Sequence, residues 1–536
     1  MPTFEGFRAD GSASDSEKDY SGADSHERSV DAHEEPHLNF DVLRLVCDYL
    51  IDIPNVLSFA LTCSALTEDA LRRRLRMAPV VLRKGESVNS FHAFLFSNEP
   101  LARASCMYGL KIRTSYYDDQ FRGQSDSQII DNHLMAILEA ATHIQYLDFQ
   151  TSISDVVFDA VVKLTTVREL RIFNDVLAYQ GPFLKGLAIF QSPLRSLRIA
   201  GCEPGGRTVY ASFLHDRLSH LAPTLEFLDL DEFPIDILPS SVTTQFTAVR
   251  SLRLQTFCTP ECDLLGVLVQ LFPNLDNTLD LGPLDAYLGE DDVPAFRERC
   301  KETQERHVWS GLDHVVCAAA YFLALQCPIR RMSTKGLRQV GRAVPPEAAD
   351  KLTHVVMSTR FGVGYRQGAR RKADNVHWDR FIDRLVRSIQ HLRLTHVRIV
   401  FSSAVYQSSR TPPRHDGPFK AVRGVDLCPA ATRFVDAMPS LRYLFLTAYG
   451  RTVVVPAPKL KNQSAFDRRV TEVWHSSGAW QVVHGEEAPL PGEPADAKVS
   501  SSCVELSHEA KERIMVQEDL HLSREEEAST EACCPL

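Results

Sequence analysis

The sequence predicts an α/β protein in which a short N-terminal helical unit precedes an irregular solenoid of parallel β-strands with helices outside. Two observations predict this fold. A strand-like pattern with apolar residues at its first, fourth and sixth positions recurs through the middle of the chain. Before it, apolar residues recur at helical spacing in short segments. A chain of 536 residues with 44% apolar content is long enough for a sizeable core and for more than one unit.

The helical unit lies at residues 37–78 and predicts three short amphipathic helices. Apolar residues of the first helix recur at positions 42, 45–46 and 49–50. Asn39 suits its N-cap, and Pro54 suits the first turn of the second helix. Three helices in about 40 residues are too few to bury their own apolar faces, so the unit needs cover from the rest of the chain or from another protein.

This segment resembles the F-box, which opens with Leu-Pro-x-Glu-(Ile/Val)-Leu, an apolar pair and Tyr-Leu. Here residues 38–43 are Leu-Asn-Phe-Asp-Val-Leu, followed by Val46-Cys47 and Tyr49-Leu50. The chain departs from the family at Asn39, which replaces a proline, and at Leu66, where an aromatic residue is common. The resemblance implies docking on a Skp-type adaptor, and through it on a cullin. The residues expected to contact the adaptor are Leu38, Asn39, Val42, Leu43, Val46, Leu50, Pro54 and Leu57. The alternative is a helical cap on the domain that follows.

The repeated pattern has the form L-x-x-L-x-L and occurs five times between residues 144 and 254. Its central apolar residues are at positions 147, 170, 197, 228 and 252, so the steps are 23, 27, 31 and 24 residues. Weaker copies lie at 279–281, 329–332, 352–357, 394–399 and 441–446, and the apolar segment 311–326 predicts a helix between two of them. The pattern resembles the leucine-rich repeat, whose period is about 20–29 residues. Unrelated β/α units on a parallel sheet are the alternative.

If the repeats stack as parallel strands, the alternation of side chains sorts them by face. The two apolar residues of L-x-L point into the core, and the residue between them points to the concave surface. This middle row contains Asp148, Arg171, Arg198, Asp229, Arg253, Asp280, Ser333, Val356, Arg398 and Phe445. The row beside it contains Tyr146, Glu169, Ser196, Phe227, Ser251, Arg331, His354, His396 and Tyr443.

The two rows allow two interpretations. Aromatic anchors and guanidinium groups suit the binding of a target protein. The candidate target-binding residues are Tyr146, Arg171, Arg198, Phe227, Arg253, Arg398, Tyr443 and Phe445. Alternatively, Arg198, Asp229, Arg253 and Asp280 alternate in sign and pair across neighbouring strands. Arg171 lies beside Arg198, which predicts charge without a partner there and makes Arg171 the preferred ligand contact.

Charge is concentrated at the two ends of the chain. Residues 1–36 have ten acids and three bases, and residues 485–536 have thirteen acids and four bases. The net charge of −10 therefore leaves +6 for the body. This gives no case for nucleic-acid binding, which uses a clustered basic face. We expect residues 1–36 to be a disordered acidic tail and 485–536 to be a mostly disordered acidic tail, with a linker at 485–504 and a short helix capped by Ser507. Residues 79–142 are expected to be a helical linker or cap, and 143–484 the repeat domain with insertions.

The thirteen cysteines are scattered, which favours a reducing compartment over a disulfide framework. Cys258 and Cys262 lack a second ligand pair at zinc spacing, so no metal is predicted. No signal peptide and no apolar run of about 20 residues is present, which predicts a cytoplasmic or nuclear protein without a membrane partner. The final Cys-Cys-Pro-Leu formally matches a prenylation signal, but a proline and acidic neighbours argue against lipidation.

Catalytic motifs are missing. The sequence contains no H-E-x-x-H, no G-x-x-x-x-G-K-[ST] and no G-x-S-x-G. Gly362, Gly364 and Gly368 have the wrong spacing for a dinucleotide turn, and the basic residues 370–372 that follow fit a solvated insertion or a patch for an acidic partner. The resemblance therefore implies a non-catalytic substrate receptor of a Skp–cullin–F-box ubiquitin ligase, without a cofactor. The alternative is a leucine-rich-repeat interaction scaffold without ligase coupling.

Overall fold

The chain divides into two compact units at residue 70, in a computed structural model of all 536 residues. The residues it describes are 39–97, 103–113, 124–150, 154–173, 186–200, 209–210, 212–231, 235–236, 244–254, 264–282, 293–317, 321, 324–335, 352–361, 378–408, 425–455, 469–484, 501–522, 527 and 530. Cys258, Cys262, the segment 362–372 and the C-terminal Cys-Cys-Pro-Leu lie outside these ranges.

The first unit begins with the predicted short helices. Their bounds are α1 Phe40–Tyr49, α2 Ile53–Thr62 and α3 Ser64–Met77, the last of which runs into the second unit. The Oδ1 atom of Asn39 accepts a hydrogen bond from the backbone N–H of Asp41 at 2.9 Å, which confirms Asn39 as the N-cap of α1. Pro54 lies in the first turn of α2, where its missing N–H has no cost.

The second unit is built on one sheet of 15 strands. The order is β1-β2-β3-β4-β5-β7-β9-β10-β11-β12-β13-β14-β15-β16-β17, parallel as far as β15 and antiparallel for the last two pairs. The bounds are β1 Val80–Leu82, β2 Gly109–Ile112, β3 Tyr146–Phe149, β4 Glu169–Phe173, β5 Ser196–Ala200, β7 Phe227–Asp231, β9 Ser251–Leu254, β10 Thr278–Gly282, β11 Leu312–Cys317, β12 Ile329–Lys335, β13 His354–Phe361, β14 His396–Ser408, β15 Tyr443–Val455, β16 Arg469–His484 and β17 Ser501–Glu505. Strands β6 Val209–Tyr210 and β8 Ile235–Asp236 form a separate pair. This confirms the predicted fold class, an α/β protein with a solenoid-like, mostly parallel sheet.

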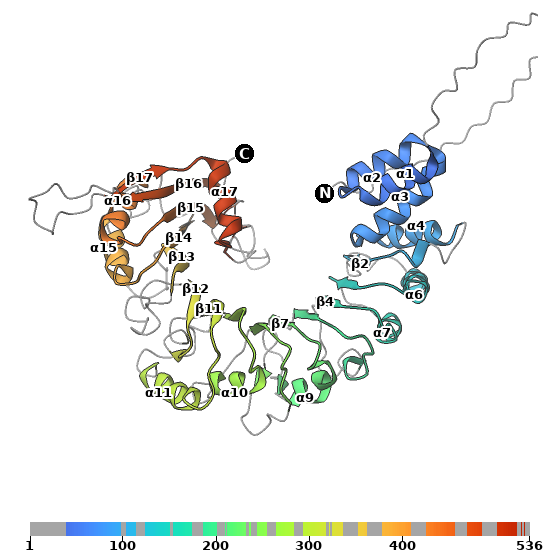
Figure 1. The fold of residues 1–536 in the computed structure, drawn as a ribbon, viewed down its shortest axis with the longest axis horizontal. Coiled ribbons are helices and arrows are strands. Elements are labelled where there is room, and N and C mark those ends of the chain that lie inside the picture. Colours follow the sequence, from blue (N-terminus) through green and yellow to red (C-terminus); the bar gives the residue numbers. More distant parts are fainter. Residues whose placement is uncertain are drawn as a thin grey trace, which may run out of the picture. The chain divides into compact units, whose positions relative to one another are not determined.

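Helices alternate with the strands and cover one face of this sheet, as Figure 1 shows within the second unit. They are α4 Gly85–Phe96, α6 Gln124–Ala140, α7 Asp155–Val162, α9 Ser212–Leu218, α10 Leu264–Leu271, α11 Val293–Gln304, α15 Trp378–Ile389 and α16 Cys428–Ala437. The core lies between helices and strands, and the L-x-L side chains of every repeat are buried in it. Helix α17 His508–Gln517 differs from these helices, because it packs on the opposite face of the sheet through a second apolar cluster that includes Met515, Leu520 and Phe445.

Strand register confirms both predicted rows. Asp148 of β3 is paired with Arg171 of β4, and the same line continues through Arg198, Asp229, Arg253 and Asp280 to Ser333, Val356, Arg398 and Phe445. The neighbouring row from Tyr146 to Tyr443 is aligned in the same way. The structure adds His314 and Val316 of β11 to the two rows.

Three segments differ from the prediction. The sheet begins at β1 and β2, inside the segment expected to be a helical linker, because Val80 and Leu110 pair in the register of the later repeats. The helix predicted at 311–326 is wrong at its start, where Leu312–Cys317 forms β11 between β10 and β12. The two adjacent valines of this segment, which are β-branched, suit a strand there. Residues 501–505, expected at the end of a linker, form β17, whereas the helix capped by Ser507 is confirmed.

Candidate binding surface

The first half of the middle row is an ion ladder, which we define as Arg198, Asp229, Arg253 and Asp280. Asp229 is buried, and its carboxylate forms ion pairs with arginines on both neighbouring strands. Arg198 lies 3.1 Å away on one side and Arg253 lies 3.9 Å away on the other. Arg253 also lies 3.1 Å from Asp280. The interpretation as cross-strand pairing is therefore confirmed for these residues, and both arginines remain partly exposed beside their acids.

Arg171 is not left without a partner, contrary to the prediction. Its guanidinium lies 3.6 Å from Glu169, two residues earlier on the same face of β4. It also lies over the ring of Tyr146, 5.4 Å from the centroid. The hydroxyl of Tyr146 donates a hydrogen bond to Asp148 at 3.1 Å, and Asp148 forms an ion pair with Lys111 of β2 at 2.7 Å. Burial, followed by the negative charge of Asp148, raises the pKa of Tyr146 to about 12.

The second half of the rows is occupied by the chain itself, through a segment that we call the C-terminal turn, residues 518–522. Arg398, 4% exposed, donates to the carbonyl oxygen of Leu520 at 2.7 Å and forms a two-point ion pair with Glu527. Arg331 donates to the carbonyl oxygen of Asp519 and forms an ion pair with its carboxylate. Both predicted rows therefore end under the protein's own polypeptide.

The conformation of the C-terminal turn follows from the end of α17. The N–H of Leu520 donates to the carbonyl of Met515 at 2.9 Å, and the N–H of Asp519 donates to that of Val516 at 3.3 Å. This is the hydrogen-bond pattern of a Schellman motif, which requires a left-handed residue after the helix. Asp519 is that residue, with φ of 46°. Leu520 is thereby directed into the apolar cluster with Met515 and Phe445, and Phe445 is only 1% exposed.

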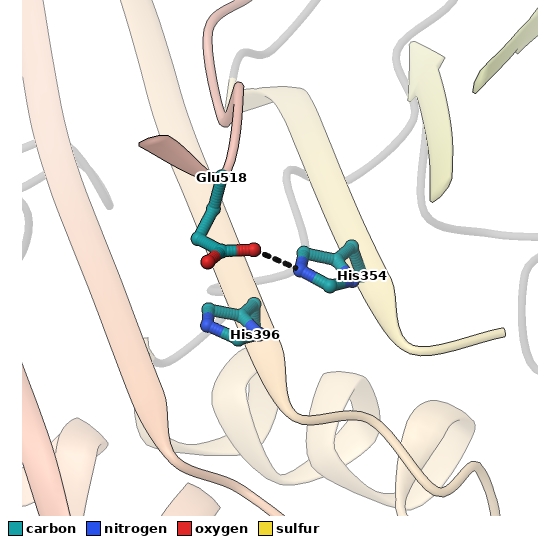
Figure 2. Close-up of side chains that lie close together, drawn as sticks. All are labelled: His354, His396 and Glu518. Carbon is teal, nitrogen blue, oxygen red and sulfur yellow. Dashed lines mark hydrogen bonds and ion pairs between the residues drawn. The ribbon is translucent and has the colours of Figure 1, made fainter. Parts of the chain in front are cut away.

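Two histidines and one glutamate meet under this turn (Figure 2). His354 of β13 and His396 of β14 are register partners, and their rings stack with centroids 4.2 Å apart. Nε2 of His354 lies 3.0 Å from a carboxylate oxygen of Glu518. Burial lowers the pKa of both histidines, that of His396 to about 4 with a contribution from His354, so both imidazoles are neutral at pH 7.

The predicted site residues thus fall into two groups. Among the candidate target contacts, Arg171, Arg198, Phe227 and Arg253 remain partly exposed, and Tyr146 lies under Arg171. Arg398 and Phe445 are covered, and Tyr443 packs against the apolar cluster of α17. Sequence reasoning missed Glu518 and the C-terminal turn. The one available signal was the repeated Leu-Thr-His-Val at 352–355 and 394–397, which places equivalent histidines on adjacent strands.

The candidate adaptor contacts lie on α1 and α2 and their flanks. Asn39, Val42, Val46 and Pro54 are exposed, and Leu43, Leu50 and Leu57 are half-buried; Leu38 lies outside the described residues. Further large apolar side chains that the prediction omitted are also exposed: Phe40, Leu45, Tyr49, Ile51 and Leu61. Leu66, by contrast, is buried.

Comparisons with known proteins leave the description at the level of fold. No protein-family model matches the chain, and no curated protein is similar enough to count as a relative. No helix among the described residues is long and apolar enough to cross a membrane. The architecture defines the class of fold: a repeat-like, mostly parallel β/α solenoid, preceded in the chain by a helical unit.

Proposed function

We propose that this chain is the substrate-recognition subunit of a Skp–cullin–F-box ubiquitin ligase. The observation that carries the proposal is the exposed apolar surface of α1 and α2. Tyr49, Ile51 and Leu61 are 78%, 82% and 81% exposed, and Phe40, Val42, Leu45 and Val46 are also exposed. So many large apolar side chains on about 20 residues are costly in water and indicate a surface for a protein partner. The F-box resemblance of the same residues supports a Skp-type adaptor as that partner, with a cullin bound through it.

The target would bind the exposed part of the concave rows, from β3 to β10. Arg171 and Arg198 present guanidinium groups on adjacent strands, Arg253 presents a third one two strands further along, and Phe227 lies half-buried beside them. Such a strip combines directional hydrogen-bond donors with an aromatic anchor. In this proposal the chain contributes no nucleophile. It raises the effective concentration of a target near the transferring enzyme.

Adaptor binding is the direct test. The variant Val42→Asp/Val46→Asp places two charges on exposed positions of α1, where the fold tolerates them. Co-purification with a Skp-type adaptor should be lost in this variant and retained in wild type. Val156→Asp/Ile189→Asp is the matched control, because these residues are equally apolar and exposed but belong to the repeat domain. Equal recovery of the adaptor with both double variants, or none with wild type, would contradict the proposal.

A target-level test follows from the same variants. Proteins whose ubiquitylation falls when this chain is removed should regain it with wild type but not with Val42→Asp/Val46→Asp. The charge reversal Arg171→Glu should also fail to restore it while retaining adaptor binding, because Arg171 lies on the concave strip and not on α1. If every variant restores ubiquitylation of these proteins, the target does not bind the concave strip.

The second candidate is an interaction scaffold without ligase coupling. Asn39 favours it, because it replaces the proline of the F-box pattern and is used here as an N-cap. The adaptor experiment separates the two functions, since a scaffold binds proteins through the strip but recovers no adaptor in wild type.

A further inference from the structure

His354, His396 and Glu518, which we call the His-His-Glu cluster, bring three ligand groups together from distant segments. One ligand atom from each lies within 4.8 Å of the other two. The histidines belong to neighbouring strands in register, whereas Glu518 is the C-cap of α17. The cluster is independent of the proposed ligase function, because none of its residues belongs to α1, α2 or the exposed strip.

Both histidines are oriented by the same device. Nδ1 of His354 lies 2.7 Å from the hydroxyl of Thr353, and Nδ1 of His396 lies 2.9 Å from that of Thr395. Each threonine hydroxyl also lies near a backbone carbonyl that can accept its proton: Thr353 lies 3.3 Å from the carbonyl oxygen of Arg330, and Thr395 lies 3.1 Å from that of Thr353. A hydroxyl that donates to a carbonyl can accept Nδ1–H, which leaves the Nε2 lone pair for a metal. The sequence builds this arrangement twice, because a threonine directly precedes the histidine that begins β13 and the histidine that begins β14.

The arrangement leaves ligand capacity unused within the described residues. His354 Nε2 shares one proton with Glu518, but the structure gives His396 Nε2 no hydrogen bond. Figure 2 shows both rings next to the Glu518 carboxylate, with planes that differ by 4°, so the rings tilt towards each other when both Nε2 lone pairs point at one ion. A cation in place of the shared proton would satisfy all three groups. The His354 proton would then move to Nδ1, where the Thr353 hydroxyl accepts it.

The surrounding charges permit a cation despite three arginines nearby, of which Arg442 is exposed and screened by water. Arg330 pairs with Asp313, and Arg331 pairs with Asp313 and Asp519. These two positive and two negative groups cancel formally. Glu518 then adds one negative charge beside two neutral imidazoles, which is a donor set that suits a divalent ion.

We propose that the His-His-Glu cluster binds one divalent transition-metal ion of the zinc class, which fastens the end of α17 to strands β13 and β14. Two imidazoles and one carboxylate are zinc ligands, and three protein ligands leave a fourth position for water or another donor. Tetrahedral bonds of about 2.0–2.1 Å place ligand atoms about 3.3 Å apart. In the structure the three ligand atoms are separated by 3.0 Å, between His354 Nε2 and Glu518, and by up to 4.8 Å for the other pairs. Rotation of the side chains is enough to bring them to the spacing that zinc needs. Glu518 can adjust readily, because it ends a helix and its side chain is 37% exposed.

The ion would join residues that are more than 100 positions apart in the chain. It would therefore hold the C-terminal turn over Arg331, Arg398 and Phe445, and metal binding would be coupled to docking of residues 501–522. The same docking is held without metal by the ion pairs and apolar contacts, so the ion reinforces a contact that already exists.

The experiment uses the full chain, freed of metal with a chelator and then titrated with Zn²⁺ by calorimetry. Other histidines and cysteines also bind zinc, so the result is a difference between variants. His354→Gln/His396→Gln should bind one equivalent fewer than wild type. Glu518→Gln should weaken that equivalent at least about tenfold, and Thr395→Val should do so by about 10- to 100-fold through loss of ring orientation.

The chain provides a matched control in His92 and His133. Their rings also stack, with centroids 4.0 Å apart, but the described residues supply no third ligand there. His92→Gln/His133→Gln should keep the wild-type stoichiometry and affinity. Hydrogen exchange gives a readout besides binding: Zn²⁺ should slow exchange of residues 508–520 in wild type and in this control, and leave it unchanged in Glu518→Gln.

Equal zinc stoichiometry and affinity in wild type and in His354→Gln/His396→Gln would overturn the proposal. So would an equivalent that Glu518→Gln leaves unchanged, because the glutamate then plays no part. If the histidine variant loses α17 through misfolding, Glu518→Gln decides the matter, since its side chain is partly exposed and keeps its shape.

Discussion

The two halves of the concave rows hold their arginines in different ways. In the first half, Arg198 and Arg253 pair with acids on the adjacent strands, within one repeat of themselves. In the second half, Arg331 and Arg398 pair with acids that lie 188 and 129 residues later in the sequence. The first half therefore satisfies its concave-face arginines locally, whereas the second half draws in acids of the C-terminal segment, in addition to Asp313 at Arg331.

This difference shows that a row of charged residues in the sequence does not by itself indicate whether the row is exposed to a binding partner. Side by side on a sheet, arginine and aspartate neutralise each other and leave an exposed strip for a partner. Arg398 faces Val356 and Phe445 on the neighbouring strands, and Arg331 reaches Asp313 of β11 at 3.5 Å, so these buried arginines draw a further carboxylate from elsewhere. In this chain that carboxylate comes from the same polypeptide, so a partner that needs the second half must first displace the C-terminal turn.

The largest effect is expected for Glu527→Gln. Arg398 is buried, and this change leaves its charge with the Leu520 carbonyl as the one hydrogen-bonded backbone acceptor among the described residues. Breaking a buried pair on one side costs about 3 kcal/mol. Hydrogen exchange of residues 508–520 should therefore accelerate by about 100-fold under conditions where local opening limits exchange. Glu505→Gln, on an exposed position of β17, is the control. Unchanged exchange in Glu527→Gln would mean that Arg398 does not hold the turn.

A smaller effect is expected in the first half, for Asp229→Asn. The buried carboxylate of Asp229 faces two arginines, but these are partly exposed and reach water when the charge is removed. The expected loss of unfolding free energy is about 2 kcal/mol, measured by urea denaturation. Asp276→Asn removes the acid of a surface pair with Arg250 and should cost less than about 1 kcal/mol. Equal losses in the two variants would remove the distinction between ladder and surface pairs.

Much of the first half could be predicted from sequence, because its contacts are local. Alternation with period two assigns each side chain to a face, and one register per repeat aligns the rows from Asp148 to Phe445. The same rule would have given Arg171 its partner, since Glu169 lies two residues away on the same face of one strand. The error at Arg171 came from counting neighbours across strands only.

The second half could not be predicted in this way. Nothing in the spacing of His354, Arg398 or Phe445 indicates that Glu518 and Leu520 return to them, because these contacts close loops of more than 100 residues. Strand β11 was missed for another reason. Its apolar segment continues past the strand end, and a run of that length fits a buried helix as well as a buried strand.

The halves should also differ in their response to pH, with His314 of β11 as the marker. Burial lowers the pKa of His314 to about 4, with Arg331 and Arg330 acting in the same direction and Asp519 and Asp313 opposing them. The unfolded chain binds this proton at about pH 6.5, so the stability held by neutral His314 is lost as pH falls from 6.5 towards 4. His314→Gln should therefore lose about 1–2 kcal/mol less than wild type between pH 7 and pH 5. Urea midpoints at the two pH values measure this, and equal losses would contradict it.

The smallest effect is expected at Asp519, which has a left-handed backbone conformation. Substitutions there distinguish the contribution of the backbone conformation from that of the carboxylate charge. Asp519→Asn keeps a residue that tolerates φ of 46° but removes the carboxylate near Arg331. Because this side chain is largely exposed, the loss should stay within about 1 kcal/mol. Asp519→Ala removes the same charge and adds the cost of a left-handed alanine, so residues 508–520 should exchange faster than in Asp519→Gly by about fivefold, equivalent to about 1 kcal/mol. If alanine and glycine behave alike, the Schellman ending does not direct Leu520 into its cluster, and the ion pairs alone would hold the C-terminal turn on the sheet.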